Sequence, residues 1–319
     1  MHRPLRLTLD RAALKHNWHW LEDRAGVPAG AAIKADGYGI GARETMRTLY
    51  DAGCRTFFVS TYAEAEDLGP VPGDSSLVVL HGVGADDADT AVQSTARPVL
   101  NSIEQVARWK QIAPDRRCDV MIDTGMNRLG LEPEDVGCVE GLSIATLHSH
   151  LACADEPSDM NALQLKRFSE LKAAIPAERY SLANSAGICL GPDYSFDLVR
   201  PGLALYGGVP RPEADGNIRQ VARVEAQIVQ RRTVRAGESC GYGAAFAASV
   251  SATATFAASP PEERHLPANS RYRYWAGFRW TWSLWGATPP RISRKAIGSS
   301  SITICRPPRK PPASASTSF

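Results

Sequence analysis

Short runs of β-branched and aromatic residues alternate with amphipathic stretches over residues 31–208. The runs that we expect to be strands are AAIK (31–34), TFFVS (56–60), SLVVL (76–80), RPVL (97–100), CDVMID (118–123), LSIATLHS (142–149), RYSLA (179–183) and FDLV (196–199). Helical spacing of apolar residues separates several of them, as in AEAEDL, SIEQVARWK and MNALQLKRFSELKAAI. Eight strands separated by helices indicate parallel βαβ units and predict a closed (β/α)8 TIM-type barrel rather than an open doubly wound sheet.

The pattern changes after this region. Residues 219–246 contain strand-like runs and glycine turns without a long helix, and the sequence after residue 258 is rich in Ser, Pro and Arg without periodicity. The three expected regions are a barrel (10–215), the start of a β-rich domain with which residues 1–9 could pair (216–258), and an aberrant, disordered tail (259–319).

Composition and charge narrow the function classes. The chain has 319 residues, of which 44% are hydrophobic, enough to form a sizeable core. Its net charge of +2 argues against nucleic-acid binding by the chain as a whole. No secretory signal begins the sequence, and no apolar run approaches the roughly 20 residues of a membrane-spanning helix. Seven cysteines without framework spacing suit a reducing compartment, so we expect a cytoplasmic protein with no membrane partner.

A lysine ends the first predicted strand, in AAIKADGYGIGA. The carboxyl ends of barrel strands face the mouth of the active site, and a partly desolvated amine there can act as a nucleophile. The glycines that follow allow close approach of the backbone to a ligand. Lys34 is therefore a candidate nucleophile, although a lysine at a strand end is also typical of a solvated rim.

Two histidines in LHSHLACADE are spaced by two residues, so His148 and His150 face the same side of a strand. One interpretation is the metal pair of a metal-dependent barrel hydrolase. A metal site needs three or four ligands, and the remaining histidines form no matching cluster, so we expect no metal.

Two further segments carry candidate anion-binding groups. In MIDTGMNRLGL, the guanidinium fork of Arg128 matches the geometry of a carboxylate. In ANSAG, Ser185 stands at a strand-to-helix turn, where a hydroxyl group and backbone N–H groups can hold phosphate. Ser185 could equally be the N-cap of a helix.

These segments, followed by DLVRPGLALYG (197–207), resemble the alanine racemase family over about residues 3–258. The family has a barrel domain that binds pyridoxal 5'-phosphate and a β domain. By this resemblance Lys34 binds the cofactor covalently, Tyr38, Ser185, Gly202 and Leu203 bind its phosphate, His150 packs against its pyridine ring, Arg200 faces the pyridine nitrogen, and Arg128 reaches the substrate carboxylate.

The resemblance implies a homodimer that interconverts L-alanine and D-alanine and supplies D-alanine for peptidoglycan. An arginine beside the pyridine nitrogen does not readily give up a proton, so the cofactor is a weak electron sink. This favours simple removal and return of the α-proton. Racemisation also needs a proton donor and acceptor on each face of the substrate, and Lys34 can serve one of them.

The family supplies the other face with a tyrosine in a Gly-Tyr-Ala-Asp-Gly motif of the partner subunit. That motif should follow TATFAA (253–258), but SPPEERHLP stands there instead. Tyr242, in CGYGAAF, corresponds to an earlier segment of the β domain. We therefore expect this chain to lack the second base and much of the dimer contact.

The tail contains the run YWAGFRWTWSLWG (274–286), with Trp275, Trp280, Trp282 and Trp285. Reading the last base of each codon with the next two forces glycine at Trp275–Ala276 and aspartate at Trp280–Thr281. The shifted frame permits Gly-Arg-Val-Ser-Met-Asp-Leu-Val, which resembles a hallmark of the racemase β domain. We interpret the run as an out-of-frame translation of a racemase tail; the alternative is a true aromatic binding platform.

Three other functions remain open. A non-catalytic barrel protein that binds pyridoxal phosphate would lack a β domain, whereas residues 219–246 look like the start of one. A basic-amino-acid decarboxylase of related fold would have a phosphate-binding loop different from ANSAG. A metal-dependent barrel hydrolase would use His148 and His150.

Overall fold

The computed structural model describes residues 4–240, 246–247, 252–257 and 280–282. The chain divides into two compact units. The first unit is Leu9–Ala222, and the second combines Met1–Thr8 with Arg223–Phe319.

Seven parallel strands form one sheet in the first unit, in chain order from β2 to β8. They are β2 (Ala31–Ala32), β3 (Thr56–Val59), β4 (Ser76–Val79), β5 (Arg97–Leu100), β6 (Cys118–Met121), β7 (Ile144–His148) and β8 (Arg179–Ser181). Every residue of β3, β6 and β7 is buried, as expected for a parallel sheet covered on both faces.

The predicted eighth strand is present as a hydrogen-bonded segment over residues 197–201. Backbone hydrogen bonds of 2.9–3.0 Å join it to the residues at β8 and at β2: Asp197 N–H to Tyr180 O, Arg200 N–H to Ala183 O, Gly30 N–H to Val199 O, and Ala32 N–H to Pro201 O. Pro201 has no N–H group to extend the ladder, which explains why the segment is not a regular strand. These bonds close the sheet, and the predicted β/α barrel is confirmed.

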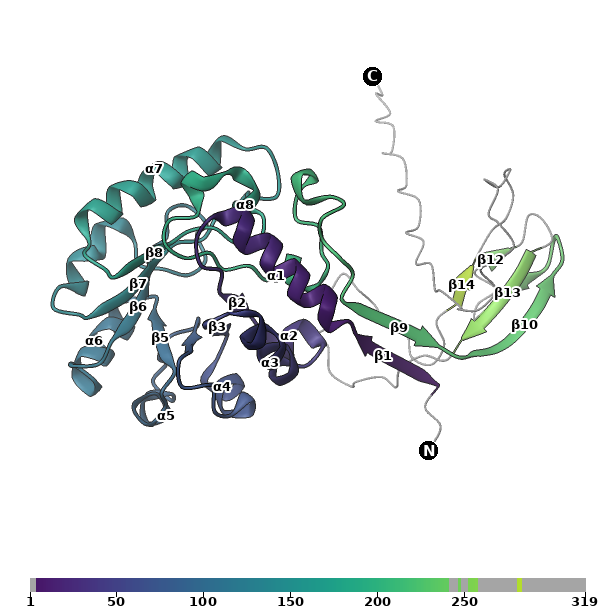
Figure 1. Ribbon diagram of the computed structural model, residues 1–319, viewed down its shortest axis with the longest axis horizontal. Coiled ribbons are helices and arrows are strands. Elements are labelled where there is room, and N and C mark those ends of the chain that lie inside the picture. The colour runs from purple at the N-terminus through teal and green to yellow at the C-terminus, as the bar shows by residue number, and fades with distance from the viewer. Residues whose placement is uncertain (1–3, 241–245, 248–251, 258–279, 283–319) are drawn as a thin grey trace, which may run out of the picture. The chain divides into compact units, whose positions relative to one another are not determined.

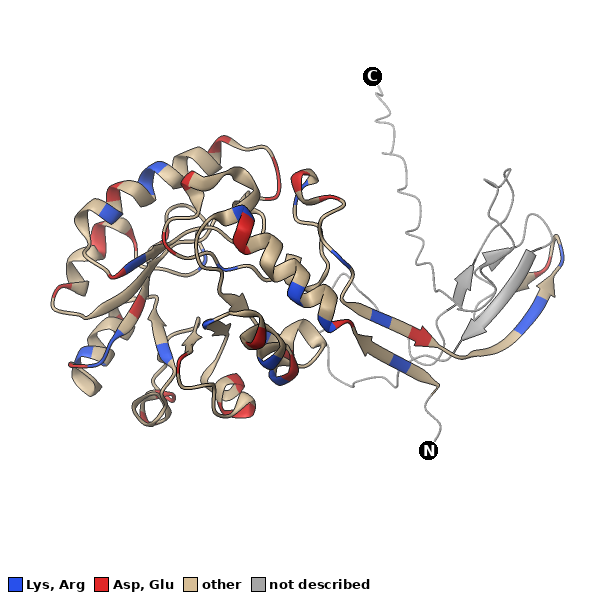
Figure 2. Ribbon diagram, in the orientation of Figure 1, with Lys and Arg blue, Asp and Glu red and all other residues tan. Residues whose placement is uncertain are grey.

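Helices cover the outside of the sheet (Figure 1). They are α1 (Arg11–Ala25), α3 (Ala42–Ala52), α4 (Tyr62–Leu68), α5 (Ala88–Gln93), α6 (Ile103–Ile112) and α7 (Asp159–Ala174). The side chains of Asp10, Thr61, Ser102 and Ser158 accept the N-cap hydrogen bonds that start α1, α4, α6 and α7. Charged residues of both signs lie along these helices, as expected for their solvated faces (Figure 2). None of the described helices is both long and apolar enough to cross a membrane.

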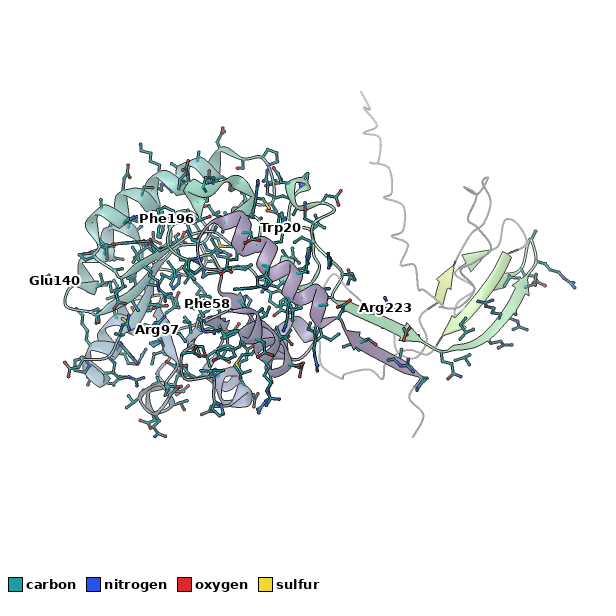
Figure 3. The ribbon with its side chains drawn as sticks, viewed as in Figure 1. Trp20, Phe58, Arg97, Glu140, Phe196 and Arg223 are labelled. Atoms are coloured by element: carbon teal, nitrogen blue, oxygen red, sulfur yellow. The ribbon has the colours of Figure 1, made fainter. Side chains whose placement is uncertain are left out.

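The barrel encloses its own small apolar cluster, distinct from the main core between sheet and helices. It consists of Ala32, Phe58, Val78, Val99 and Met121, one from each of β2 to β6, and Leu198 from the segment over residues 197–201. Phe58, labelled in Figure 3, is the largest of these and is 1% exposed. Because side chains alternate along a strand, the neighbours of Phe58, Phe57 and Val59, pack in the main core instead.

The second unit contains short strands only, among the residues described. β1 (Leu5–Leu9) pairs with β9 (Ala222–Ala226), and β11 (Ser239–Cys240) pairs with β12 (Phe246–Ala247). A three-stranded antiparallel sheet has the order β10-β13-β14, formed by Ile228–Val234, Ala252–Ala257 and Trp280–Trp282.

Within residues 259–319 the structure describes β14, in which Trp280–Trp282 pairs with Ala254–Phe256; the expectation of a disordered tail over the remaining residues stays a prediction. Tryptophan and threonine favour extended pairing, which accounts for a strand at WTW. Tyr242, Trp275 and Trp285 lie outside the described residues, and the out-of-frame interpretation stays a prediction.

Candidate functional site

Lys34 lies just beyond β2, at the start of an unusual turn, α2 (Lys34–Gly39). Four consecutive residues, Ala35–Tyr38, have φ between 49° and 63° and therefore form a left-handed turn. Only Gly37 among them adopts this conformation without cost; each of the others costs roughly 1–2 kcal/mol. The predicted strand over 31–34 was thus too long, because the left-handed turn ends the extended backbone at Ala32.

Carboxylates hold this turn in place. Glu64 accepts the Ala35 N–H at Oε1 (2.9 Å) and the Ser60 N–H at Oε2 (2.7 Å). Asp36 Oδ1 accepts the Ala42 N–H at 2.8 Å. The backbone next to Lys34 is therefore fixed at the mouth of the barrel. Sequence reasoning missed both carboxylates, although Thr61 and Glu64 have the spacing of a capping box.

Tyr38, at the end of this turn, packs against Tyr206, a residue that lies far along the chain. Its ring stacks on that of Tyr206, with centroids 4.6 Å apart, and Tyr206 donates its hydroxyl to Ala32 O at 2.8 Å. A Cβ added to Gly202 would lie 2.2 Å from the Tyr38 hydroxyl oxygen, so Gly202 leaves the space in which this hydroxyl sits. Burial raises the pKa of Tyr38 and of Tyr206, so both phenols are neutral at pH 7. Sequence reasoning did not select Tyr206.

Ser185 is buried and turns its hydroxyl toward the loop that precedes η3 (Leu203–Tyr206). Its Oγ accepts the backbone N–H groups of Gly202 (3.0 Å) and Ala204 (3.2 Å). The neighbouring Asn184, rather than Ser185, caps the helix that follows: its Oδ1 accepts N–H groups at the start of α8 (Gly187–Leu190) at 2.9 and 3.1 Å. Sequence reasoning therefore missed Asn184. The Leu203 side chain is 51% exposed.

Arg200 is buried near the end of the segment over residues 197–201 that closes the barrel, which we call the closing segment. Its guanidinium binds the residues after β7. It donates to Ser149 O at 2.5 Å and to the Ser181 hydroxyl, and its Nη2 lies 3.4 Å from His150 Nδ1. Burial lowers the pKa of Arg200 to about 10, so the guanidinium remains charged at pH 7. Ser181 is a further residue that the sequence did not indicate.

His150 is half-buried among cations. Burial first, and then the charges of Arg200, Arg128 and Lys34, lower its pKa to about 3. The imidazole is therefore neutral at pH 7, and its Nδ1 can accept from Arg200. Of these cations, Arg200 lies within contact distance of the His150 ring.

Arg128 is exposed and lies in a loop that Asp123 organises. Asp123 Oδ1 accepts the N–H groups of Gly125 and Met126, each at 2.7 Å, and its Oδ2 accepts the Arg128 N–H at 3.1 Å. This turn, which Asn127 completes with φ of 55°, fixes the backbone from which the guanidinium extends. Asp123 was not selected from the sequence.

His148 and His150 face different partners. His148 Nε2 bonds Asp119 Oδ2 at 3.0 Å, deep in the barrel, whereas His150 faces Arg200. In the part of the chain that the structure describes, no three His, Cys, Asp or Glu side chains are grouped as a metal site requires. The geometry gives no support to the histidine pair as a metal site.

Lys34, Arg128 and His150 follow the carboxyl ends of β2, β6 and β7, so all three lie at one mouth of the parallel barrel. Arg200 lies beside His150 there, and the Tyr38 hydroxyl lies at Gly202. Such a set suits an anionic ligand with an aromatic ring and an electrophilic carbon that the amine can attack. The comparisons with known proteins agree with this chemistry. The family model of the alanine racemase N-terminal domain matches residues 9–210.

The chain belongs to the alanine racemase family. It is 41% identical over 251 residues to an alanine racemase of Rhizobium meliloti, an alignment that covers 75% of this chain and 66% of that protein. It is 42% identical over 255 residues to an alanine racemase of Methylobacterium nodulans, covering 76% and 69%. This alanine racemase family member therefore spans about two thirds of the length of these relatives.

A solved structure shares the fold. The crystal structure of alanine racemase from Bartonella henselae with covalently bound pyridoxal phosphate matches at a TM-score of 0.74 and 32% identity. The match covers 80% of this chain and 75% of that one. The family resemblance found in the sequence is thereby confirmed.

Proposed function

We propose that this chain binds pyridoxal 5'-phosphate through Lys34 and acts on alanine, with racemisation impaired by loss of the second base. The observation that carries the proposal is the placement of Lys34, Arg128 and His150 after the carboxyl ends of β2, β6 and β7, with Arg200 Nη2 3.4 Å from His150 Nδ1. Its support is the arrangement of Lys34, Arg128 and Arg200, together with the named cofactor of the Bartonella relative.

The described residues fit this cofactor. Gly202 lacks the Cβ that would displace the Tyr38 hydroxyl, and Ser185 Oγ accepts the Gly202 N–H at 3.0 Å, so the hydroxyls of Tyr38 and Ser185 lie at the same loop, where a phosphate would bind. Leu203, next in the chain, would add its N–H. His150 would lie against the ring, with Arg200 at the pyridine nitrogen. When bound, pyridoxal phosphate supplies an electron sink for the bond that loses its proton.

The chain's own residues would move one proton. Once the substrate has displaced Lys34 from the cofactor, its free amine would take the α-proton from one face of alanine and return it there, while Arg128 would bind the carboxylate through its planar fork. Arg200 remains charged and donates to Ser149 O, so it holds its own proton. SPPEERHLP stands where the family's opposite-face tyrosine belongs, so no base is assigned to that face.

The family's homodimer would supply that base from the partner subunit. We therefore propose that the chain, even if paired with a second copy, turns L-alanine into D-alanine slowly. D-alanine supply for peptidoglycan would be correspondingly weak.

The test is an absorbance titration of the purified full chain with pyridoxal phosphate. Wild type should gain the visible absorption of a covalently bound cofactor, and Lys34→Ala should not. Lys166→Ala is a matched control, because the Lys166 side chain is 75% exposed on α7. If wild type shows no such absorption, the cofactor assignment is wrong. Rapid formation of D-alanine would contradict only the impairment.

A non-catalytic pyridoxal-phosphate-binding barrel is the second candidate, favoured by the missing tyrosine motif. Incubation with each alanine enantiomer in deuterium oxide separates the two. A single base at Lys34 exchanges the α-proton of one enantiomer for deuterium with little inversion. A non-catalytic binder exchanges neither.

A further inference from the structure

A hydrogen-bonded chain of three side chains crosses the barrel interior, and the proposed function does not use it. Arg97 on β5 donates its Nε to Asp119 Oδ1 at 2.5 Å, and Asp119 Oδ2 bonds His148 Nε2 at 3.0 Å. Asp119 on β6 and His148 on β7 are fully buried. Figure 3 labels Arg97.

Burying the negative charge of Asp119 costs free energy, because a carboxylate removed from water needs a close partner and satisfied hydrogen bonds. Burial raises the pKa of Asp119, but its bonds from His148 and Arg97 outweigh burial and hold the pKa below the ordinary value. Asp119 is therefore ionised beside the apolar cluster of Phe58, Val99 and Met121. Apolar side chains could fill the same layer, so a charge kept there calls for a role beyond stability.

His148 connects the hydrogen-bonded side chains of Arg97 and Asp119 to the proposed cofactor site at Arg200. It is the last residue of β7, and the next two residues both contact Arg200: Ser149 through its carbonyl at 2.5 Å and His150 through Nδ1 at 3.4 Å. The bond to ionised Asp119 places the proton of neutral His148 on Nε2 and fixes its ring. The end of β7 is thereby fixed in the position from which it binds Arg200.

The charge of Asp119 also acts on Arg200. Burial lowers the pKa of Arg200, and the negative charge of Asp119 opposes that effect. The hydrogen-bond partners of Arg200 are a carbonyl, a hydroxyl and a neutral imidazole, so Asp119 contributes negative charge that those partners do not.

We propose that Asp119 is a positioning residue for the cofactor site: through His148 it fixes the end of β7, from which Ser149 and His150 hold Arg200. The inference rests on the proposed function, which assigns Arg200 to the pyridine nitrogen. It adds Asp119 on β6, which β7 and β8 separate from the closing segment, to the determinants of cofactor affinity.

The experiment compares three variants of the full chain. Asp119→Asn keeps the shape and removes the charge. Arg97→Gln/Asp119→Asn removes both charges, so that no unpaired buried guanidinium remains if the single variant folds poorly. Thr146→Val is the matched control, since Thr146 lies on the same face of β7 as His148 and its buried hydroxyl has no hydrogen-bond partner.

Two readouts are recorded: the dissociation constant and visible spectrum of pyridoxal phosphate, and the ¹⁵N signals of the histidine rings in the cofactor-free protein. We expect Asp119→Asn to weaken cofactor binding by about tenfold or more, because a charged hydrogen bond that orders the site is lost. Its absorption maximum and its His150 ring signals should shift. The double variant should regain resistance to urea without regaining affinity, and Thr146→Val should match wild type in both readouts.

Unchanged affinity and spectrum in Asp119→Asn would overturn the inference, as would a double variant that regains affinity together with stability. If wild type itself binds no pyridoxal phosphate, the proposed function fails separately. The ring signals then decide: a shift at His150 in Asp119→Asn, absent in Thr146→Val, supports the positioning role, and no shift refutes it.

Discussion

The strands of the barrel and the strand β10 of the second unit differ in how they are stabilised. All four residues of β3 are buried, whereas five of the seven residues of β10 are exposed, and Val229 is 64% exposed. Burial of apolar area is the main favourable term in folding, so β3 gains much from it and β10 gains little. Every candidate site residue also lies within Leu9–Ala222. The cofactor chemistry therefore depends on the part of the chain that supplies its own core.

The largest expected effect comes from the barrel core. Phe57 is fully buried between sheet and helices, and Phe57→Ala should lower the free energy of unfolding by about 3–5 kcal/mol through lost burial and the cavity left behind. Urea unfolding followed by tryptophan fluorescence measures it. A loss below about 1 kcal/mol would mean that the barrel is loosely packed, and the contrast between β3 and β10 would then fail.

Acid should weaken the barrel. His148 has a pKa of about 4 when folded, lowered by burial, against roughly 6.5 when unfolded. Between these values the unfolded state binds more protons, so unfolding free energy should fall by about 1.4 kcal/mol for each pH unit from pH 6.5 to 4. His150 acts in the same direction, with a pKa of about 3. Asp119, with its lowered pKa, keeps its stabilising charge over this window.

Unfolding free energies measured at several pH values test this dependence. His148→Gln should reduce the slope. His19→Gln, at an exposed position on α1, should leave it unchanged. A slope that is the same in all three proteins would show that His148 does not titrate as its burial implies.

A third substitution, Gly202→Ala, tests the candidate site itself rather than the barrel core. Gly202→Ala would push the Tyr38 hydroxyl aside and should weaken pyridoxal phosphate binding by about tenfold, equivalent to ~1.4 kcal/mol. Gly73→Ala is the control: an added Cβ there meets nothing within 4 Å, so affinity should not change. Equal affinities for the two variants would show that the space at Gly202 does not matter to the cofactor.

The smallest effect belongs to β10. Val229→Ala removes an exposed side chain and should change the free energy of unfolding by no more than about 0.5 kcal/mol. The same urea experiment measures it. A loss comparable to that of Phe57→Ala would mean that β10 is covered in solution, and the contrast between the two regions would then fail.

The sequence predicted the barrel well because strand and helix periodicity are local properties. Thr56–Val59 and Arg97–Leu100 lie within their predicted runs. It failed where geometry is set by distant partners. The left-handed turn at Ala35–Tyr38, which Glu64 binds from 29 residues away, ended β2 early.

The candidate site shows the same limit. Residues within a recognisable motif, such as Lys34 and Arg200, could be selected from the sequence. Glu64, Asp119 and Tyr206 could not, because their roles arise from contacts with residues 29, 29 and 174 positions away along the chain. Ser185 was selected, but the sequence did not indicate that Asn184 makes the capping bonds of α8; the phosphate role of Ser185 stays a prediction.

The most direct test of the account is borohydride reduction of the full chain with bound pyridoxal phosphate, followed by peptide mass spectrometry. We predict that the reduced cofactor is attached to Lys34 and that the same preparation, assayed before reduction, forms little D-alanine. A preparation in which Lys34 remains unmodified, or in which another lysine carries the label, would contradict it.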